Sequence, residues 1–221
     1  MTKRKINRIV NCNSMNICSI YIRRNIMTKR DEQREQRKRD ILFAGLSLFI
    51  RKGYTGTKIK DIANAVDMSA GLLFHYFASK EELYIALVKL GIEGPMKSVQ
   101  VKGFKPLAFF ETTAKNVLSS IQNEPFVANM FVFMSQAYSS DDVPESVKTL
   151  LADFDVFSPT AGIIEQGQSD GSIRQGNPMA LAIAFWGAVQ GVAGTLALNP
   201  GSPCPSSGWI VDIIRNQIGT N

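Results

Sequence analysis

Helical periodicity constrains this fold more than any other feature of the sequence. After Ile41, apolar residues return at the third, fourth, seventh and eighth positions, which is the stripe of an amphipathic helix. Two shorter helices are expected next, one beginning after an N-cap at Thr57 and one over Ser69–Phe77 that Ser69 can cap. A tight turn at 67–69 joins them. Two short helices connected in this way behind a longer one have the geometry of a helix-turn-helix.

The remainder of the chain shows the same helical period and almost no strand signal, so we expect an all-α protein. The residue before the next helix, Ser79, is a candidate N-cap, and that helix is expected to stop by Gly94–Pro95. Later helices are expected over Pro106–Ile121, Glu124–Tyr138, Pro144–Gln168, Pro178–Leu198 and Ser206–Ile218. Ser158 and Pro159 predict a kink in the helix over 144–168.

Positive charge is concentrated in the first part of the chain. Residues 1–90 contain 18 Lys and Arg against 8 Asp and Glu, whereas residues 91–221 contain 7 against 11. A basic segment attracts polyanions, either nucleic acid or an anionic membrane surface, although a charge run can also be a solvated face. The two parts of the chain are therefore expected to do different jobs.

Cysteine and histidine are scarce. Cys12, Cys18 and Cys204 stand in no metal-ligand spacing with His75, so we expect neither a metal site nor a cofactor. The cysteine usage indicates a reducing, cytoplasmic compartment. No Gly-rich phosphate loop follows a strand and no Ser or Cys has a nucleophile-elbow context, so we do not expect an enzyme.

The first 26 residues lack stable periodicity and make a poor signal peptide. Met27-Thr28-Lys29-Arg30 then repeats the opening Met1-Thr2-Lys3-Arg4. We interpret residues 1–30 as a disordered or mis-annotated N-terminal extension. Translation then starts at either Met1 or Met27.

A nearly continuous series of residues over 39–90 matches a known family in order and spacing. The residues are Ile41, Leu42, Ala44, Phe49, Gly53, Tyr54, Thr57, Ile59, Asp61, Ile62, Ala63, Val66, Ser69, Gly71, Phe74, His75, Tyr76, Phe77, Ser79, Lys80, Glu81, Glu82 and Leu83. This stretch resembles the DNA-binding domain of the tetracycline-repressor (TetR) family. The sequence departs from the family at Phe74, where the usual Tyr would add a hydroxyl that could reach DNA.

The resemblance implies a three-helix helix-turn-helix DNA-binding domain over 31–92 and a helical effector-binding and dimerisation domain over 93–221. It implies that Lys58, Lys60, Tyr76 and Lys80 meet phosphates and that residues 69–72 lie nearest the base edges. Leu73 and Phe77 are expected in the core. The full set of implied DNA contacts is Thr57, Lys58, Lys60, Ser69, Ala70, Gly71, Leu72, Phe74, His75, Tyr76 and Lys80.

Pro178–Leu198 is uncharged over 21 residues, which is long enough to cross a bilayer. Gln190 and three glycines interrupt it, and basic residues do not flank both ends. We therefore favour a helix buried between its own core and a second subunit, with a homodimer formed through 178–218 and no membrane contact.

The function expected from these features is that of a DNA-binding transcriptional regulator. The resemblance implies a repressor, the most frequent role in this family, that a small hydrophobic effector releases from a palindromic operator in double-stranded DNA; the sequence leaves an activator as the other possible sign of the response. The alternative is a helical membrane-associated or scaffold protein that uses its basic front on anionic surfaces. A bend at Pro159 is expected to open a pocket with Gln136 among its polar groups. The expected ligand-binding residues are Phe109, Met130, Phe131, Met134, Tyr138, Phe154, Phe157, Trp186 and Gln190.

Overall fold

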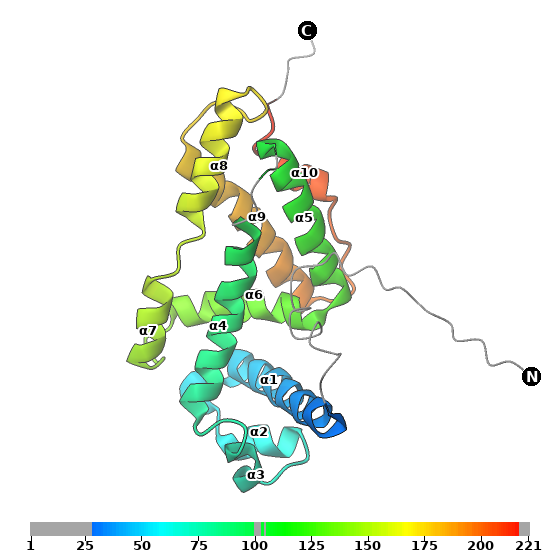
Figure 1. Ribbon diagram of the computed structural model, residues 1–221, viewed down its shortest axis with the longest axis vertical. Coiled ribbons are helices and arrows are strands. Elements are labelled where there is room, and N and C mark those ends of the chain that lie inside the picture. The colour runs from blue at the N-terminus through cyan, green and yellow to red at the C-terminus, as the bar shows by residue number, and fades with distance from the viewer. Residues whose placement is uncertain (1–27, 100–102, 104, 217–221) are drawn as a thin grey trace, which may run out of the picture.

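The computed structural model describes residues 28–99, 103 and 105–216, which form helices joined by short connections (Figure 1). The helices are α1 (Lys29–Gly56), α2 (Ile59–Ala65), α3 (Ala70–Phe74), α4 (Lys80–Val99), α5 (Pro106–Asn123), α6 (Pro125–Ser139), α7 (Glu145–Ala152), α8 (Phe157–Ser169), α9 (Pro178–Leu198) and α10 (Ser207–Val211). The all-α prediction is confirmed. In the described part of the chain, β-pairing amounts to one isolated bridge between Ile173 and Arg215.

Two hydrophobic clusters hold the helices together. The first lies among α1, α2, α3 and α4 and includes the fully buried Ile41 and Leu83. The second is formed mainly by α5, α8, α9 and α10 and includes the fully buried Phe185. Helix α6 belongs to both, because Phe133 packs into the first cluster and Ala128 into the second. It crosses between the two halves of the molecule in Figure 1.

Side-chain caps confirm several predicted helix starts. Ser69 Oγ accepts the amide N–H of Leu72 at 3.1 Å, and Ser79 Oγ accepts that of Glu82 at 3.0 Å. The side chain of Asn177 caps α9, whose first residue is the proline expected there. These caps satisfy amides at helix N-termini that have no partner within the helix.

Other helix boundaries differ from the prediction. The helix expected over 144–168 is two helices, and Pro159 lies in the first turn of α8, where a missing N–H breaks no intrahelical hydrogen bond. The predicted kink at Ser158–Pro159 is therefore wrong. Helix α4 continues beyond Pro95, and α10 ends at Val211, well before the expected Ile218. The last residues of the supposed N-terminal extension, 28–30, begin α1, and residues 1–27 lie outside the described residues.

Helix α9 is long and apolar enough, by length and composition, to cross a membrane. In the structure it packs against α5, α6, α8 and α10 and buries Phe185 and Val189. Its opposite side leaves Ile183 52% exposed. The helix therefore has one face in the core and one uncovered apolar face.

Candidate nucleic-acid interface and apolar cavity

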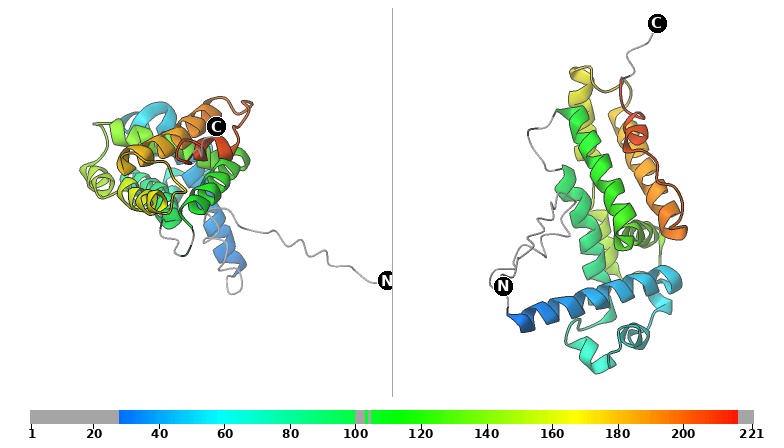
Figure 2. Two further views of the ribbon diagram at one scale, coloured as in Figure 1. Left: turned by 90° about the horizontal axis from the view of Figure 1, so that it is seen from above. Right: turned by 90° about the vertical axis from the view of Figure 1, so that its right-hand side faces the viewer.

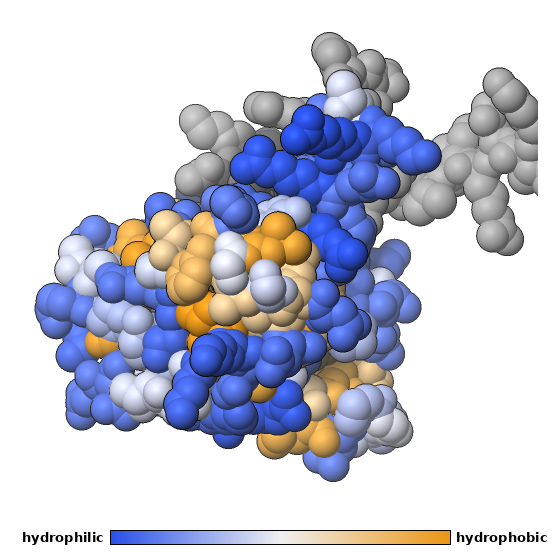
Figure 3. Space-filling view, turned by 90° about the horizontal axis from the view of Figure 1, so that it is seen from below, coloured by the Kyte–Doolittle hydropathy of each residue, from blue (hydrophilic) through white to orange (hydrophobic). Residues whose placement is uncertain are grey.

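Helices α2 and α3 form the predicted helix-turn-helix at one end of the molecule (Figure 1). Leu73 and Phe77 are buried, as predicted, whereas Leu72 and Phe74 are 46% and 47% exposed. Figure 3 looks onto this end and shows an apolar patch ringed by hydrophilic side chains. Apolar side chains on such a helix can contact thymine methyl groups in the major groove. Of the other predicted contacts here, Ser69, Gly71 and His75 are exposed, and Ala70 and Tyr76 are half-buried.

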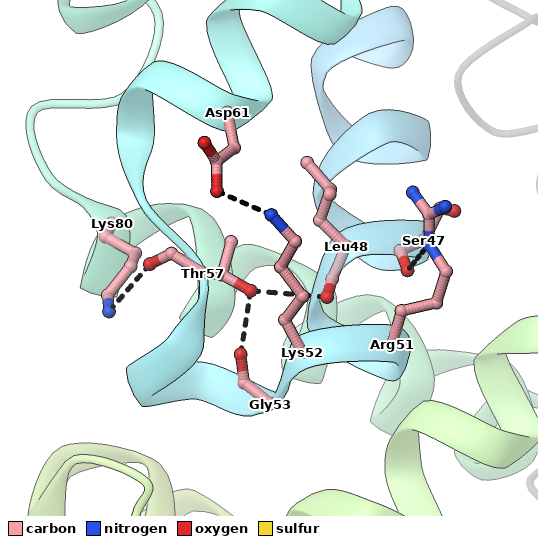
Figure 4. A network of polar contacts seen from close by, with 8 residues as sticks. All are labelled: Ser47, Leu48, Arg51, Lys52, Gly53, Thr57, Asp61 and Lys80. Atoms are coloured by element: carbon pink, nitrogen blue, oxygen red, sulfur yellow. Dashed lines mark hydrogen bonds and ion pairs between the residues drawn. The ribbon is translucent and has the colours of Figure 1, made fainter.

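Thr57 has a different role from the one predicted. Gly53, with φ of 70°, ends the regular part of α1 in the left-handed region that favours glycine. The Thr57 side chain is buried, and its hydroxyl reaches the carbonyl oxygens of Gly53 at 2.7 Å and Leu48 at 3.2 Å (Figure 4). The predictions that Thr57 caps α2 and that its side chain contacts DNA are therefore wrong, because the hydroxyl is used inside the domain.

Lys80, the first residue of α4, binds the same connection between α1 and α2. Its Nζ donates to the carbonyl oxygen of Thr57 at 3.1 Å (Figure 4). It also donates to the carbonyl oxygen of Tyr54 at 2.7 Å and lies 4.1 Å from the centre of the Tyr54 ring. Partial burial lowers the pKa of the Lys80 ammonium below its ordinary value. A phosphate contact from Lys80 would have to share the ammonium with these two carbonyls.

Two other predicted phosphate contacts, Lys58 and Lys60, are exposed on or beside α2. The start of α2 is held to α1 by the ion pair between Lys52 Nζ and Asp61 Oδ2, 2.8 Å apart (Figure 4). The hydrogen bond from Lys52 lowers the pKa of Asp61. Lys52 is therefore held in an ion pair within the domain, whereas Lys58 and Lys60 are exposed to solvent.

A cavity of about 860 Å³ lies between the helix-turn-helix domain and the helices behind it. Its wall contains most of the predicted ligand-binding residues: Met130, Phe131, Met134, Tyr138, Phe154, Phe157, Trp186 and Gln190. Phe109 is the exception, because it is buried in the second cluster with its ring centre 5.1 Å from that of Phe110. The prediction that Phe109 lines the pocket is wrong.

Most polar side chains of the wall are engaged by the protein itself. Gln190 Nε2 donates to a backbone carbonyl of α6 at 3.0 Å, and the Tyr138 hydroxyl donates to one of α7 at 3.1 Å. Trp186 Nε1 donates to the buried hydroxyl of Thr160 at 3.0 Å, which fixes the indole against α8. Ser120 Oγ, by contrast, is buried and has no hydrogen-bond partner among the described residues. The cavity surface is therefore largely apolar.

The sequence did not predict that the DNA-binding domain forms part of this wall. Leu42 and Phe43 of α1 and Gly91 of α4 line the cavity, and the Phe43 ring centre is 4.4 Å from that of Phe126 in α6. Phe43 is a large apolar residue outside the apolar stripe of α1, and this position could have predicted a second contact surface on the helix. Gln136, expected in the pocket, instead places its amide nitrogen 3.4 Å from a carbonyl of α1.

Comparison with known proteins identifies the helix-turn-helix. Residues 41–87 match the sequence model described as "Bacterial regulatory proteins, tetR family". The transcriptional regulator RutR of Escherichia coli K12 is 26% identical over 168 residues, covering 73% of this chain and 76% of RutR. Among solved structures, the regulator MbdR from Azoarcus sp. CIB has a TM-score of 0.68 at 16% identity, over 83% of this chain and all of MbdR. AibR, in complex with isovaleryl coenzyme A and operator DNA, has a TM-score of 0.60 at 20% identity, over 80% of this chain and 94% of that one.

The fold and the exposed recognition helix define a helix-turn-helix DNA-binding transcriptional regulator. Residues 41–87 carry the DNA-binding domain of the tetR family of bacterial regulatory proteins, and the relatives that match about three quarters of the chain are transcriptional regulators.

Substitutions of Lys58, Lys60 and Lys80 should have different effects on DNA binding and on stability. Lys58→Met and Lys60→Met should each make the dependence of log affinity on log salt shallower by about 0.9 per bound chain, because each removes one phosphate contact. Neither should change stability, since both side chains are exposed. Lys80→Met should instead lower the free energy of unfolding by about 1 to 3 kcal/mol, because it removes a charged donor from two carbonyls. Urea unfolding and fluorescence anisotropy at several salt concentrations measure both quantities. An unchanged unfolding curve for Lys80→Met would show that the network in Figure 4 is dispensable.

Proposed function

We propose that this protein is a repressor that binds a palindromic operator as a homodimer and leaves it when a small apolar effector enters the cavity. One observation carries the proposal: the cavity wall combines α1 and α4 of the DNA-binding domain with α6 and α9 of the rear domain. A ligand there contacts both domains at once. The cavity volume, about 860 Å³, lies in the range usual for small-molecule sites. The same proposal places the protein in the cytoplasm, where operator DNA is found.

The uncovered face of α9 supports the homodimer. It carries the exposed Ile183 and Gly187, which also lie at the edge of the cavity, together with Ala184 and Gly191, and a Cβ added at either glycine would meet open space. Small residues allow a second helix to approach closely. A two-fold dimer formed through 178–218 would present two copies of α3 to a roughly palindromic site.

This proposal predicts a dimer in solution without detergent. The full chain should elute from a size-exclusion column with light scattering at the mass of two chains, because pairing covers the apolar face of α9. Ile183→Glu should shift the mass to one chain, whereas Glu165→Gln on α8, also exposed, should leave it unchanged as a control for surface charge. Recovery of the wild-type chain in the membrane fraction would contradict the proposal.

The wall of the cavity indicates the class of effector. Its charged residues are Arg39 against Glu93 and Glu124, and the remaining surface is largely apolar. AibR is named as a complex with isovaleryl coenzyme A, a thioester whose phosphates make it an anion. A single arginine and two glutamates do not suit such an anion. We therefore propose an uncharged or cationic, largely apolar effector for this chain.

Two fluorescent probes test this preference. Nile red, which is uncharged and apolar, should bind the full chain and raise its melting temperature, whereas the anion 1-anilinonaphthalene-8-sulfonate should bind at least tenfold more weakly. Phe131→Leu should weaken Nile red binding because Phe131 lines the cavity. The matched change Phe109→Leu should lower stability but leave the affinity of the folded protein unchanged. Equal effects of the two substitutions on affinity would place the probe elsewhere.

Helix α4 offers a route from the cavity to the helix-turn-helix. Its first residue, Lys80, holds the α1–α2 connection, and further along the helix Gly91 lines the cavity. A Cβ at Gly91 would stand 2.6 Å from Cγ of Met134, so α4 and α6 cross here in direct contact. A ligand that displaces the flexible Met134 side chain therefore changes the space available to α4.

Gly91→Ala should mimic this displacement. We expect operator affinity to fall about tenfold without any ligand, because the added methyl group forces Met134 and α4 apart. Gly94→Ala is the control, since it adds the same methyl group to α4 where a Cβ would meet nothing within 4 Å. Fluorescence anisotropy on a duplex selected by the wild-type chain from random DNA measures the affinities. Equal operator affinities for the two variants would show that α4 does not transmit ligand binding to the helix-turn-helix.

A further inference from the structure

We propose that the N-terminal turns of α1 form a second DNA-contacting surface, which binds phosphates flanking the site reached by α3. Residues 29–39 precede Ile41, the first buried residue of α1, and none of them belongs to either hydrophobic cluster. At 1.5 Å per residue they make about 16 Å of helix. Both views of Figure 2 show this end of α1 extending past the rest of the domain. Because this stretch of helix does not pack into a hydrophobic core, core packing does not explain the distribution of its charged residues.

Its pattern is a segregation of charge. Asp31 borders the basic face, but its carboxylate accepts the backbone N–H of Thr28 at 3.1 Å and the Thr28 hydroxyl at 2.7 Å in a capping box, and these bonds lower its pKa. The other acidic residues of this stretch lie around the rest of the helix, together with Lys29 and Arg39. Four exposed basic residues share about a third of the circumference at 3.6 residues per turn: Arg30, Arg34, Arg37 and Lys38.

The basic face looks toward both ends of α3. Lys38 Nζ lies 5.6 Å from the ring centre of Phe77, which follows α3 in the chain. Arg37 lines a surface hollow together with Ala65 and Asp67, which belong to the segment that leads into α3. Figure 3, which views the DNA-facing end, shows a hydrophilic segment projecting beside the apolar patch, on the side where Figure 2 places the start of α1.

The position of the basic face beside α3 favours DNA as its partner. A duplex held by α3 continues outward beneath the overhanging helix, and its phosphates are the nearest anions that four aligned cations can meet. From Lys38 back to Arg30 the helix rises about 12 Å, which corresponds to three or four base pairs at 3.4 Å each. Each chain should therefore protect three or four base pairs beyond the region that α3 and α2 contact. The inference needs DNA binding by the chain and is independent of the effector and of the cavity.

The test compares two variants of the full chain that lose the same charge. R30Q/R34Q/R37Q removes three cations from the basic face, and K89Q/K115Q/K148Q removes three exposed lysines from α4, α5 and α7. A duplex selected by the wild-type chain from random DNA is used at full length and trimmed by four base pairs at each end of the hydroxyl-radical footprint. On the long duplex, the arginine variant should lose the outer three or four base pairs of protection. Its salt dependence should be shallower by up to about 0.9 for each arginine per chain.

On the trimmed duplex, the arginine variant should bind like the wild-type chain, and the lysine variant should match the wild-type chain on both. Equal losses on both duplexes, or an unchanged footprint, would overturn the proposal. Loss of binding to vesicles containing phosphatidylserine, with DNA binding intact, would overturn it in favour of a membrane surface. The single variant R30Q keeps the test decisive if the triple variant unfolds, since Arg30 lies eleven residues before the first buried position. It should remove the outermost protection alone.

Discussion

Helix α6 is the element on which the rest of the structure depends, because it is packed on two sides by two different cores. Phe133 lies between Phe49 and Tyr84 of the DNA-binding domain, with ring centres 6.4 and 4.8 Å away. Phe131, two residues earlier, faces the rear cluster, and its carbonyl is held by Gln190 of α9. Close packing makes such an interface resist gradual deformation. The two domains are therefore coupled by a shared rigid helix, and the cavity lies directly against it.

The geometry of the helix-turn-helix depends on a second, polar device. The connection between α1 and α2 turns at Gly53, and buried Thr57 and half-buried Lys80 donate hydrogen bonds to the carbonyl groups around this turn. Burial of a carbonyl without a donor costs about 1 to 3 kcal/mol. Placing the donor on the first residue of α4 makes the orientation of α2 and α3 depend on where α4 begins.

The sequence predicts the positions of the helices better than it predicts the roles of individual side chains. Period and capping residues predict most of the helices, because caps such as Ser69 and Ser79 act locally. The predicted end of α4 is wrong because the helix continues through Pro95, a residue that usually ends or kinks a helix. The Thr57 hydroxyl can either cap the following helix or donate to a carbonyl of the preceding turn, and the backbone conformation at Gly53 determines which of the two occurs.

The aromatic and methionine content of the rear domain predicted an apolar pocket, but for the wrong reason. Pro159 produces no kink, and the cavity arises where α1 and α4 cross α6 and α9 without filling the space between them. Phe109 and Phe131 carry the same side chain on neighbouring helices, and only the packing of α5 against α9 and α10 places the first in the core. Sequence identifies the apolar residues, whereas tertiary packing decides which of them face a cavity.

The position of α1 in the cavity wall sets a thermodynamic condition on any response. A ligand shifts a conformational equilibrium only as far as its affinities for the two states differ. Phe43 touches Phe126 across the cavity, so a movement of α1 relative to α6 alters the surface that a ligand meets. Operator DNA, which holds α1 through the helix-turn-helix, must then change ligand affinity by the same factor as the ligand changes DNA affinity. Under the proposed function the coupling comes from this shared wall, so substitutions at Phe43 are expected to change both binding events together, whereas substitutions deep in the second cluster are expected to change stability alone.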